Sequence, residues 1–253
     1  MQRVNSFGIA FALSILFAAS AILPSVSQAT PVKAKTKKII VYRGIGGCNS
    51  CAAAAAKAVR VLGLPVDYVS ASEVTPEIFE GAVMWVQPAG NAISAAKALG
   101  KERMALIRDF VKQGGGYLGF CAGAFLADTT VDDDGKVVGI GLLPFSTADY
   151  EVNDTDNIDM VWMNWQGKRR HVFFNGGATF LIGDSKPVVD VIATYGKDRL
   201  PGAIHMTFGS GHVVLSGAHP ESPQTWKDNN GLTDEDGSDL DLAGQLAEIA
   251  AGK

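Results

Sequence analysis

The stretch "GGGYLGFCAGAFLAD", residues 114–128, decides which fold this sequence predicts. Its apolar run ends at Cys121, and a glycine stands two residues away on either side, at Gly119 and Gly123. A cysteine that only fills a core needs no such neighbours, whereas a sharp turn from a strand into a helix crowds the backbone and excludes side chains. The stretch therefore predicts a strand that passes at Cys121 directly into a helix.

Strand and helix patterns alternate on the N-terminal side of this turn. Short apolar or β-branched runs closed by glycine or proline are typical of buried strands, and alanine-rich segments favour helices because alanine loses no side-chain entropy there. Strands separated by helices in this order predict an α/β fold whose parallel sheet is covered on both faces. The expected strands lie in 37–44, 65–71, 82–90 and 116–121, and the expected helices in 49–63 and 92–115, the latter broken near Gly100.

The second half of the chain has a hairpin pattern. We expect hairpins in 160–177, with QGKR near the turn, and in 203–221, turning at GSG, with a strand in 188–196 and a closing helix in 239–252. The segment "TDEDGSDLD", 233–241, spaces its carboxylates as calcium loops do, but the closing glutamate is missing. We interpret it as a solvated lead-in to the last helix. Because no repeat or long linker occurs, residues 30–253 are expected to form a single domain.

Composition limits the classes of partner. The chain has 253 residues, of which 47% are hydrophobic and 19% charged, and its net charge is −4. This is the balance of an ordinary globular protein, and it gives no electrostatic reason to expect nucleic acid or a membrane surface as a partner. We expect a small-molecule substrate or ligand instead.

The N-terminus has the pattern of a signal peptide over residues 1–29. Arg3 precedes an apolar stretch over 7–23, and small residues stand at Ser27 and Ala29, where signal peptidase requires them. The pattern predicts export, to the periplasm or the medium, without a membrane attachment once the leader is cleaved. An uncleaved membrane anchor is the rival interpretation.

Export changes the interpretation of the three cysteines. Cys48 and Cys51 lie in the motif "GGCNSC". In an oxidising compartment such a close pair can form a disulfide, and Cys121 then stays a free thiol. A redox pair that exchanges with Cys121, and half of a zinc site completed by a histidine, stay open as alternatives. No metal or other cofactor is assigned.

Three glycine-containing loops are expected to meet around Cys121. Sites in parallel α/β sheets form beyond the carboxyl ends of the strands, so the loops GIGGCNSC, QPAGN and FCAGA share one rim. A helix N-terminus behind the cysteine favours thiolate. In "SGAHPE", His219 ends a β-run and Glu221 follows two residues later, so the carboxylate can hold one imidazole nitrogen while the other faces the thiol.

"GFCAGAF", "QPAG" and "SGAHPE", in this order, resemble the class I glutamine amidotransferase-like superfamily. Within it, "CAGAF", "GIGLLPFSTA" (139–148) and "FFNGG" (173–177) are similar to the biotin–protein ligase N-terminal domain group. The resemblance implies a flavodoxin-like sandwich with a mostly parallel central sheet, to which the second half adds β-hairpins. Members of the superfamily often pair, so a homodimer is one expectation.

The resemblance also implies roles for particular residues. Cys121 would be the nucleophile, His219 the base and Glu221 the group that orients it. The backbone amides of Ala122 and of Ala89 or Gly90 would form an oxyanion hole. The rim loops would include Gly46, Gly47, Asn175, Gly176 and Gly177. Glutamine amidotransferases usually have a glutamine shortly after the cysteine, where this chain has Ala124 and Phe125.

These features lead to one functional hypothesis and two alternatives. The first is an exported cysteine-dependent hydrolase or amidase-like enzyme that attacks a small amide, ester or thioester carbonyl through Cys121. The second, favoured by the missing glutamine, is a non-catalytic module that binds a ligand or partner. The third is a thiol redox sensor that uses all three cysteines.

Overall fold

A computed structural model describes residues 36–132, 134–153, 157–183 and 188–253. The signal-peptide interpretation of residues 1–29 falls outside them. The strands are β1 (Lys38–Tyr42), β2 (Val66–Val69), β3 (Ala82–Gln87), β4 (Gly116–Phe120), β5 (Ser146–Asp149), β6 (Ile158–Trp165), β7 (Lys168–Asn175), β8 (Ala178–Leu181), β9 (Asp190–Tyr195), β10 (Pro201–Phe208) and β11 (Gly211–Ser216). The α-helices are α1 (Asn49–Val59), α2 (Ala92–Lys112), α3 (Ala122–Leu126), α4 (Gln224–Asn229) and α5 (Leu240–Ala250), and the short 3₁₀ helices are η1 (Arg60–Leu62), η2 (Ala71–Glu73) and η3 (Pro76–Phe79).

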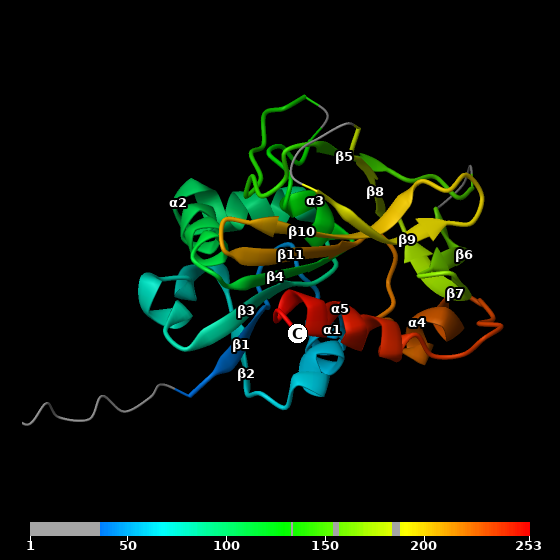
Figure 1. The fold of residues 1–253 in the computed structure, drawn as a ribbon, viewed down its shortest axis with the longest axis horizontal. Coiled ribbons are helices and arrows are strands. Elements are labelled where there is room, and N and C mark those ends of the chain that lie inside the picture. Colours follow the sequence, from blue (N-terminus) through cyan, green and yellow to red (C-terminus); the bar gives the residue numbers. More distant parts are fainter. Residues whose placement is uncertain (1–35, 133, 154–156, 184–187) are drawn as a thin grey trace, which may run out of the picture. The chain divides into compact units, whose positions relative to one another are not determined.

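Among the described residues, nine strands form one sheet in the order β2-β1-β3-β4-β11-β10-β9-β6-β7. The first four of these pair only with parallel neighbours, as the alternating pattern predicts, and β11 is parallel to β4 but antiparallel to β10. Helices α1 and α5 lie on one face of this part and α2 and α3 on the other (Figure 1). The predicted α/β sandwich with a mostly parallel central sheet is therefore confirmed.

The antiparallel strands extend the same sheet. The two expected hairpins are β6–β7 and β10–β11, and β9 joins them by pairing with both β10 and β6. The β6–β7 turn falls at Gln166 and Gly167, both of which have positive φ. Strands β5 and β8 form a separate two-stranded sheet. The predicted hairpins thus widen the central sheet on the side of β11.

Strand β4 shows why the centre of the sheet must be apolar on both faces. Leu118 and Phe120 point into the layer shared with α1 and α5, whereas Tyr117 points into the layer shared with α2. All three side chains are fully buried. A parallel strand with helices on both sides buries every side chain, so its sequence is a continuous apolar run rather than an alternating one.

Helix α2 contains the break expected near Gly100. That residue has φ of 67° inside the helix, a conformation that glycine adopts without the steric cost of a side chain. In the part of the chain that the structure describes, no helix is long and apolar enough to cross a membrane.

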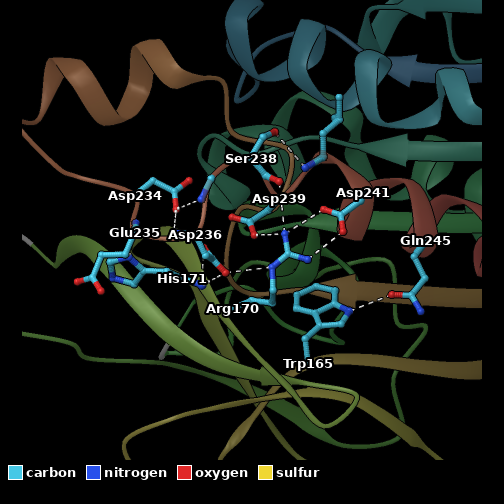
Figure 2. Close-up of polar contacts among 12 residues, drawn as sticks. Trp165, Arg170, His171, Asp234, Glu235, Asp236, Ser238, Asp239, Asp241 and Gln245 are labelled. Atoms are coloured by element: carbon cyan, nitrogen blue, oxygen red, sulfur yellow. Dashed lines mark hydrogen bonds and ion pairs between the residues drawn. The ribbon is translucent and has the colours of Figure 1, made fainter.

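The interpretation of residues 233–241 as a solvated lead-in is wrong for Asp234 and Asp239, whose side chains are buried, although most of the segment is exposed. Arg170 of β7 donates hydrogen bonds to Asp236, Asp239 and Asp241 at 3.2, 2.9 and 2.9 Å (Figure 2). The side chain of Asp239 is completely buried. The carboxylates gather because a cation from a distant strand supplies the donors that water would otherwise provide.

Candidate active site

The turn at Cys121 has the backbone crowding that its glycines predict. Cys121 joins β4 directly to α3 with φ of 47° and ψ of −105°, which is strained for a residue with a side chain. A Cβ on Gly119 would lie 2.6 Å from the carbonyl oxygen of Gly123, and a Cβ on Gly123 would overlap the carbonyl oxygen of Gln87. Both glycines are therefore needed for the strand and helix to approach.

The thiol of Cys121 lies at the start of α3 and is nearly buried. Its backbone amide donates to the carbonyl oxygen of Ser216 at 2.8 Å, which fixes the turn to β11. Its Sγ lies 3.6 and 3.7 Å from the carbonyl oxygens of Asn175 and Gly176. Because Ala122 opens the helix, its amide has no acceptor one turn earlier in that helix and can donate to a ligand.

His219 and Glu221 form a buried pair just beyond β11. The amide of His219 donates to the carbonyl oxygen of Phe173 at 2.8 Å, which ties this segment to β7. Nδ1 of His219 lies 3.0 Å from Oε1 of Glu221, and both side chains are almost completely buried. Nε2 of His219 and Oε2 of Glu221 have no hydrogen-bond partner among the described residues.

The surroundings favour the charged form of His219. Burial alone would lower the pKa of the imidazole, but the charges of Glu221 and Cys121 and its contacts with both groups raise that pKa to about 10. The raised pKa keeps the imidazolium form at neutral pH. This cation lies in the pocket that Cys121 also lines.

Ala89 and Gly90, the second expected source of oxyanion donors, lie beside the loop that follows β1. Gly47 and Gly90 form an isolated antiparallel bridge, and the amide of Asn91 donates to the carbonyl oxygen of Gly46 at 2.7 Å. Gly90 has φ of 145°, and a Cβ there would overlap the carbonyl oxygen of Gly46. These contacts hold Ala89 and Gly90 at the pocket that also contains Cys121.

Cys48 and Cys51 lie in the same pocket. Their sulfur atoms lie within bonding distance, with the Cα atoms 5.0 Å apart. Cys48 is the N-cap of α1, and its Sγ accepts a hydrogen bond from the amide of Cys51 at 2.9 Å. Cys51 and Cys121 belong to one small buried cluster with Ala89. The loop after β1 therefore places its two sulfur atoms in the pocket that Cys121 lines.

The pocket has a volume of about 320 Å³, and α4 supplies part of its wall. This wall consists of Trp226, Asn229 and Asn230, which the sequence patterns do not single out. Trp226 follows Glu221 closely in the sequence, and its indole packs edge-on against His219 with ring centroids 5.7 Å apart. The lining residues are Cys48, Ser50, Cys51, Ala89, Gly90, Cys121, Phe173, Asn175, His219, Trp226, Asn229 and Asn230.

A second hollow of about 650 Å³ meets the first at Cys121. It is lined by residues from the N-terminus of α2, from α3 and from β5, with Gly176 at its edge. Of the predicted rim positions, Gly46 and Gly47 support Gly90 from outside, and Gly177 lies against Gly217 rather than in either hollow. Phe125, where amidotransferases usually have glutamine, lines the second hollow.

Comparisons with known proteins agree with this architecture. The sequence model of the family described as "Biotin-protein ligase, N terminal" matches residues 37–137 and 147–248. "Biotin--protein ligase" of Schizosaccharomyces pombe is 28% identical over 208 residues, covering 72% of this chain and 33% of that protein. The chain thus spans about a third of the length of this curated relative.

Solved structures are similar in fold. One described as a glutamine amidotransferase has a TM-score of 0.57 and 20% identity, covering 80% of this chain and 98% of that one. A cytoplasmic protein of Salmonella typhimurium has a TM-score of 0.51 and 14% identity, covering 83% and 97%. At these identities the likeness shows the fold alone, and it is the amidotransferase-like fold that the motifs predict.

Proposed function

The chain belongs to the biotin–protein ligase N-terminal family, and from that premise we propose that it is a cysteine-dependent hydrolase or amidase-like enzyme for small carbonyl compounds. The observation that supports this proposal is a buried histidine with one nitrogen bound to a carboxylate and the other free, beside a cysteine on a strained turn. This is the arrangement that activates a thiol nucleophile.

In the proposed first step, Sγ of Cys121 attacks the carbonyl carbon of an amide, ester or thioester. The electron pair of the C=O bond moves to oxygen, and the amide of Ala122 with that of Ala89 or Gly90 donates hydrogen bonds to it. When the carbonyl re-forms, the leaving group departs and takes a proton from Nε2 of His219. The product is a thioester between the acyl group and Cys121.

In the second step, water attacks the thioester and gives a proton to Nε2 of His219. The acid is released, and Cys121 leaves as thiolate beside a renewed imidazolium. Glu221 keeps its hydrogen bond to Nδ1 throughout, so it orients the ring and stabilises its positive charge.

The experiment is to alkylate the non-reduced protein with iodoacetamide and map the modified residues by mass spectrometry. We expect fast labelling of Cys121 at neutral pH and a rate at least about tenfold lower in His219→Ala, because the imidazolium stabilises the thiolate. His212→Ala serves as a matched control, since this histidine contacts His205 and lies outside both hollows. Slow labelling that does not respond to the His219 substitution would contradict the proposal.

Two contacts of Cys121 favour a second candidate, a ligand-binding module without turnover. The carbonyl oxygens of Asn175 and Gly176 suit a neutral thiol that donates its proton, and they would repel a thiolate. On this alternative, Cys121→Ala leaves ligand binding intact and no acyl-enzyme forms with any activated ester. Detection of a thioester on Cys121 by intact-mass measurement would exclude it.

We further propose that residues 1–29 direct export and that Cys48 and Cys51 form a structural disulfide in the exported protein. The N-terminal sequence and the non-reduced mass of protein recovered from the cell envelope or medium test both statements. Cleavage after Ala29 with the pair oxidised is expected. An intact N-terminus, or two free thiols at these positions, would contradict the respective statement.

A further inference from the structure

The two hollows that meet at Cys121 share an electrostatic property. Within the part of the chain that the structure describes, neither is lined by a lysine or an arginine. His219 is the only lining residue that gains positive charge, and it already faces Glu221. A substrate with a carboxylate or phosphate would find no unmatched cation in either hollow.

The smaller hollow is aromatic on one side and sulfur-containing on the other. The rings of Phe173, His219 and Trp226 lie 5.7 to 6.0 Å apart, and they face the pair of Cys48 and Cys51. The exposed side chains of the lining are neutral and polar, namely Ser50, Asn175, Asn229 and Asn230. About 320 Å³ is at the lower end of ligand pockets, so a short apolar chain fits it.

The larger hollow is lined by carboxylates. Asp132, Asp134 and Asp149 line it together with Asp128, which accepts hydrogen bonds from Thr147 at 2.6 and 2.9 Å. Asp134 forms an exposed ion pair with Lys136 at 2.7 Å, so one lysine stands against four lining aspartates. These groups repel an anion that approaches the thiol from this side. They leave room for a neutral or positively charged leaving group.

We propose that the site takes small acyl compounds that carry no negative charge, with an apolar acyl chain against Phe173 and Trp226. This inference rests on the proposed function and narrows its substrate. It separates the chain from enzymes that use glutamine, because the α-carboxylate of glutamine would lie either against aromatic rings or against carboxylates, at a desolvation cost that no cation offsets.

Binding to the Cys121→Ala variant tests the inference independently of turnover. Butyramide and glutaramate are matched probes, because glutaramate is butyramide with one terminal carboxylate added. Isothermal titration calorimetry at neutral pH should give a dissociation constant for butyramide at least about tenfold lower than that for glutaramate. Equal or tighter binding of glutaramate, or no binding of either amide, would overturn the inference.

A charge-insertion variant sharpens the same test. In Cys121→Ala/Asn230→Lys, a cation at the mouth of the smaller hollow should narrow the ratio of the two dissociation constants at least about threefold. The control, Cys121→Ala/Asn164→Lys, makes the same change on an exposed residue of β6 outside both hollows and should leave the ratio unchanged. Equal narrowing by both variants would show an effect of net charge, contrary to the inference.

Failure of the substrate class and failure of the proposed function give different results. If Cys121 is alkylated rapidly and the rate depends on His219, but glutaramate binds more tightly than butyramide, the proposed function stands and the substrate class is wrong. If butyramide binds selectively but Cys121 is inert to alkylation, the pocket is as inferred and the protein is the binding module.

Discussion

Two groups of charged side chains contact β7, and they differ in how completely the cation of each group is paired. In the first group, His219 contacts β7 through Phe173, and Nε2 of His219 and Oε2 of Glu221 have no hydrogen-bond partner among the described residues. In the second group, Arg170 donates to Asp236, Asp239, Asp241 and a backbone carbonyl (Figure 2). An unpaired atom that faces a pocket is available for chemistry, whereas a fully paired cation holds structure.

The second group supports the first. Lys227 of α4 forms a buried ion pair with Asp234, in the segment that continues to the aspartates around Arg170. The neighbouring residue, Trp226, lines the pocket. The amide of His171, next to Arg170, donates to Asp236 at 3.2 Å. The carboxylate cluster therefore fixes the helix that forms one wall of the candidate active site.

The largest effect is expected from Arg170→Met, which leaves several carboxylates without their cation. We expect the free energy of unfolding to fall by about 2–3 kcal/mol, below the range for fully buried pairs because the Arg170 side chain is 17% exposed. Urea denaturation at neutral pH measures it. Arg169→Met is the control, since that guanidinium stacks on Trp162 and its loss should lower the free energy of unfolding by less than about 1 kcal/mol. An equal fall in the free energy of unfolding in both variants would contradict the structural role assigned to Arg170.

Glu221→Gln should slow iodoacetamide labelling of Cys121 by about tenfold at neutral pH. The reason is that the carboxylate raises the pKa of His219 and so maintains the charge that stabilises the thiolate. Asp239→Asn is the matched change in the other group and should leave the labelling rate unaltered. A similar slowing by both substitutions would mean that the two groups are not separate in function.

The two groups should also affect stability in different pH ranges. Burial raises the pKa of Asp239 from 3.8 to about 7, so its contribution to stability is fully present below about pH 4 and is lost as pH rises through 7. The pKa of His219 is raised from 6.5 to about 10, so its contribution is present below 6.5 and is lost as pH rises through 10.

Denaturation across this pH range checks both statements. Asp239→Asn should flatten the fall in stability between about pH 4 and 7 and leave the higher range unchanged. His219→Gln should do the reverse. A profile that neither substitution changes would show that other groups carry the pH dependence.

The smallest effect is expected within the Arg170 group itself. The side chain of Asp241 is 65% exposed although it lies 2.9 Å from Arg170. Because solvent screens such a pair, Asp241→Asn should change the free energy of unfolding by less than about 0.5 kcal/mol. If Asp241→Asn lowered the free energy of unfolding as much as Arg170→Met, the exposed aspartate would contribute as much to stability as the buried ones.

The candidate catalytic residues could be predicted because each lies in a short local pattern. Gly119 and Gly123 mark the turn at Cys121 within a few residues, and Glu221 follows His219 at a spacing that permits the observed hydrogen bond. Most of the strands and both hairpins follow from periodicity and turn residues in the same way, whereas no pattern predicts β5 or β8. Local backbone constraints operate before any distant contact is made.

The wall of the pocket and the carboxylate cluster could not be predicted in that way. Nothing in the neighbourhood of Trp226 or Asn230 indicates that α4 turns toward Cys121. The aspartates of residues 233–241 resemble a solvated segment, because the pattern does not contain Arg170, which lies more than sixty residues earlier. A charged residue is classed as exposed unless its partner is known.

The sequence by itself determined the alternation of strands and helices, the strained turn at Cys121 and the pairing of His219 with Glu221, since these depend on neighbours along the chain. Only the tertiary structure decided which side chains surround the thiol, which aspartates are buried and where the cations are absent. The physical reason is that burial and electrostatic environment depend on residues brought together by the sheet, so a side chain's charge and exposure are set by partners far away in sequence.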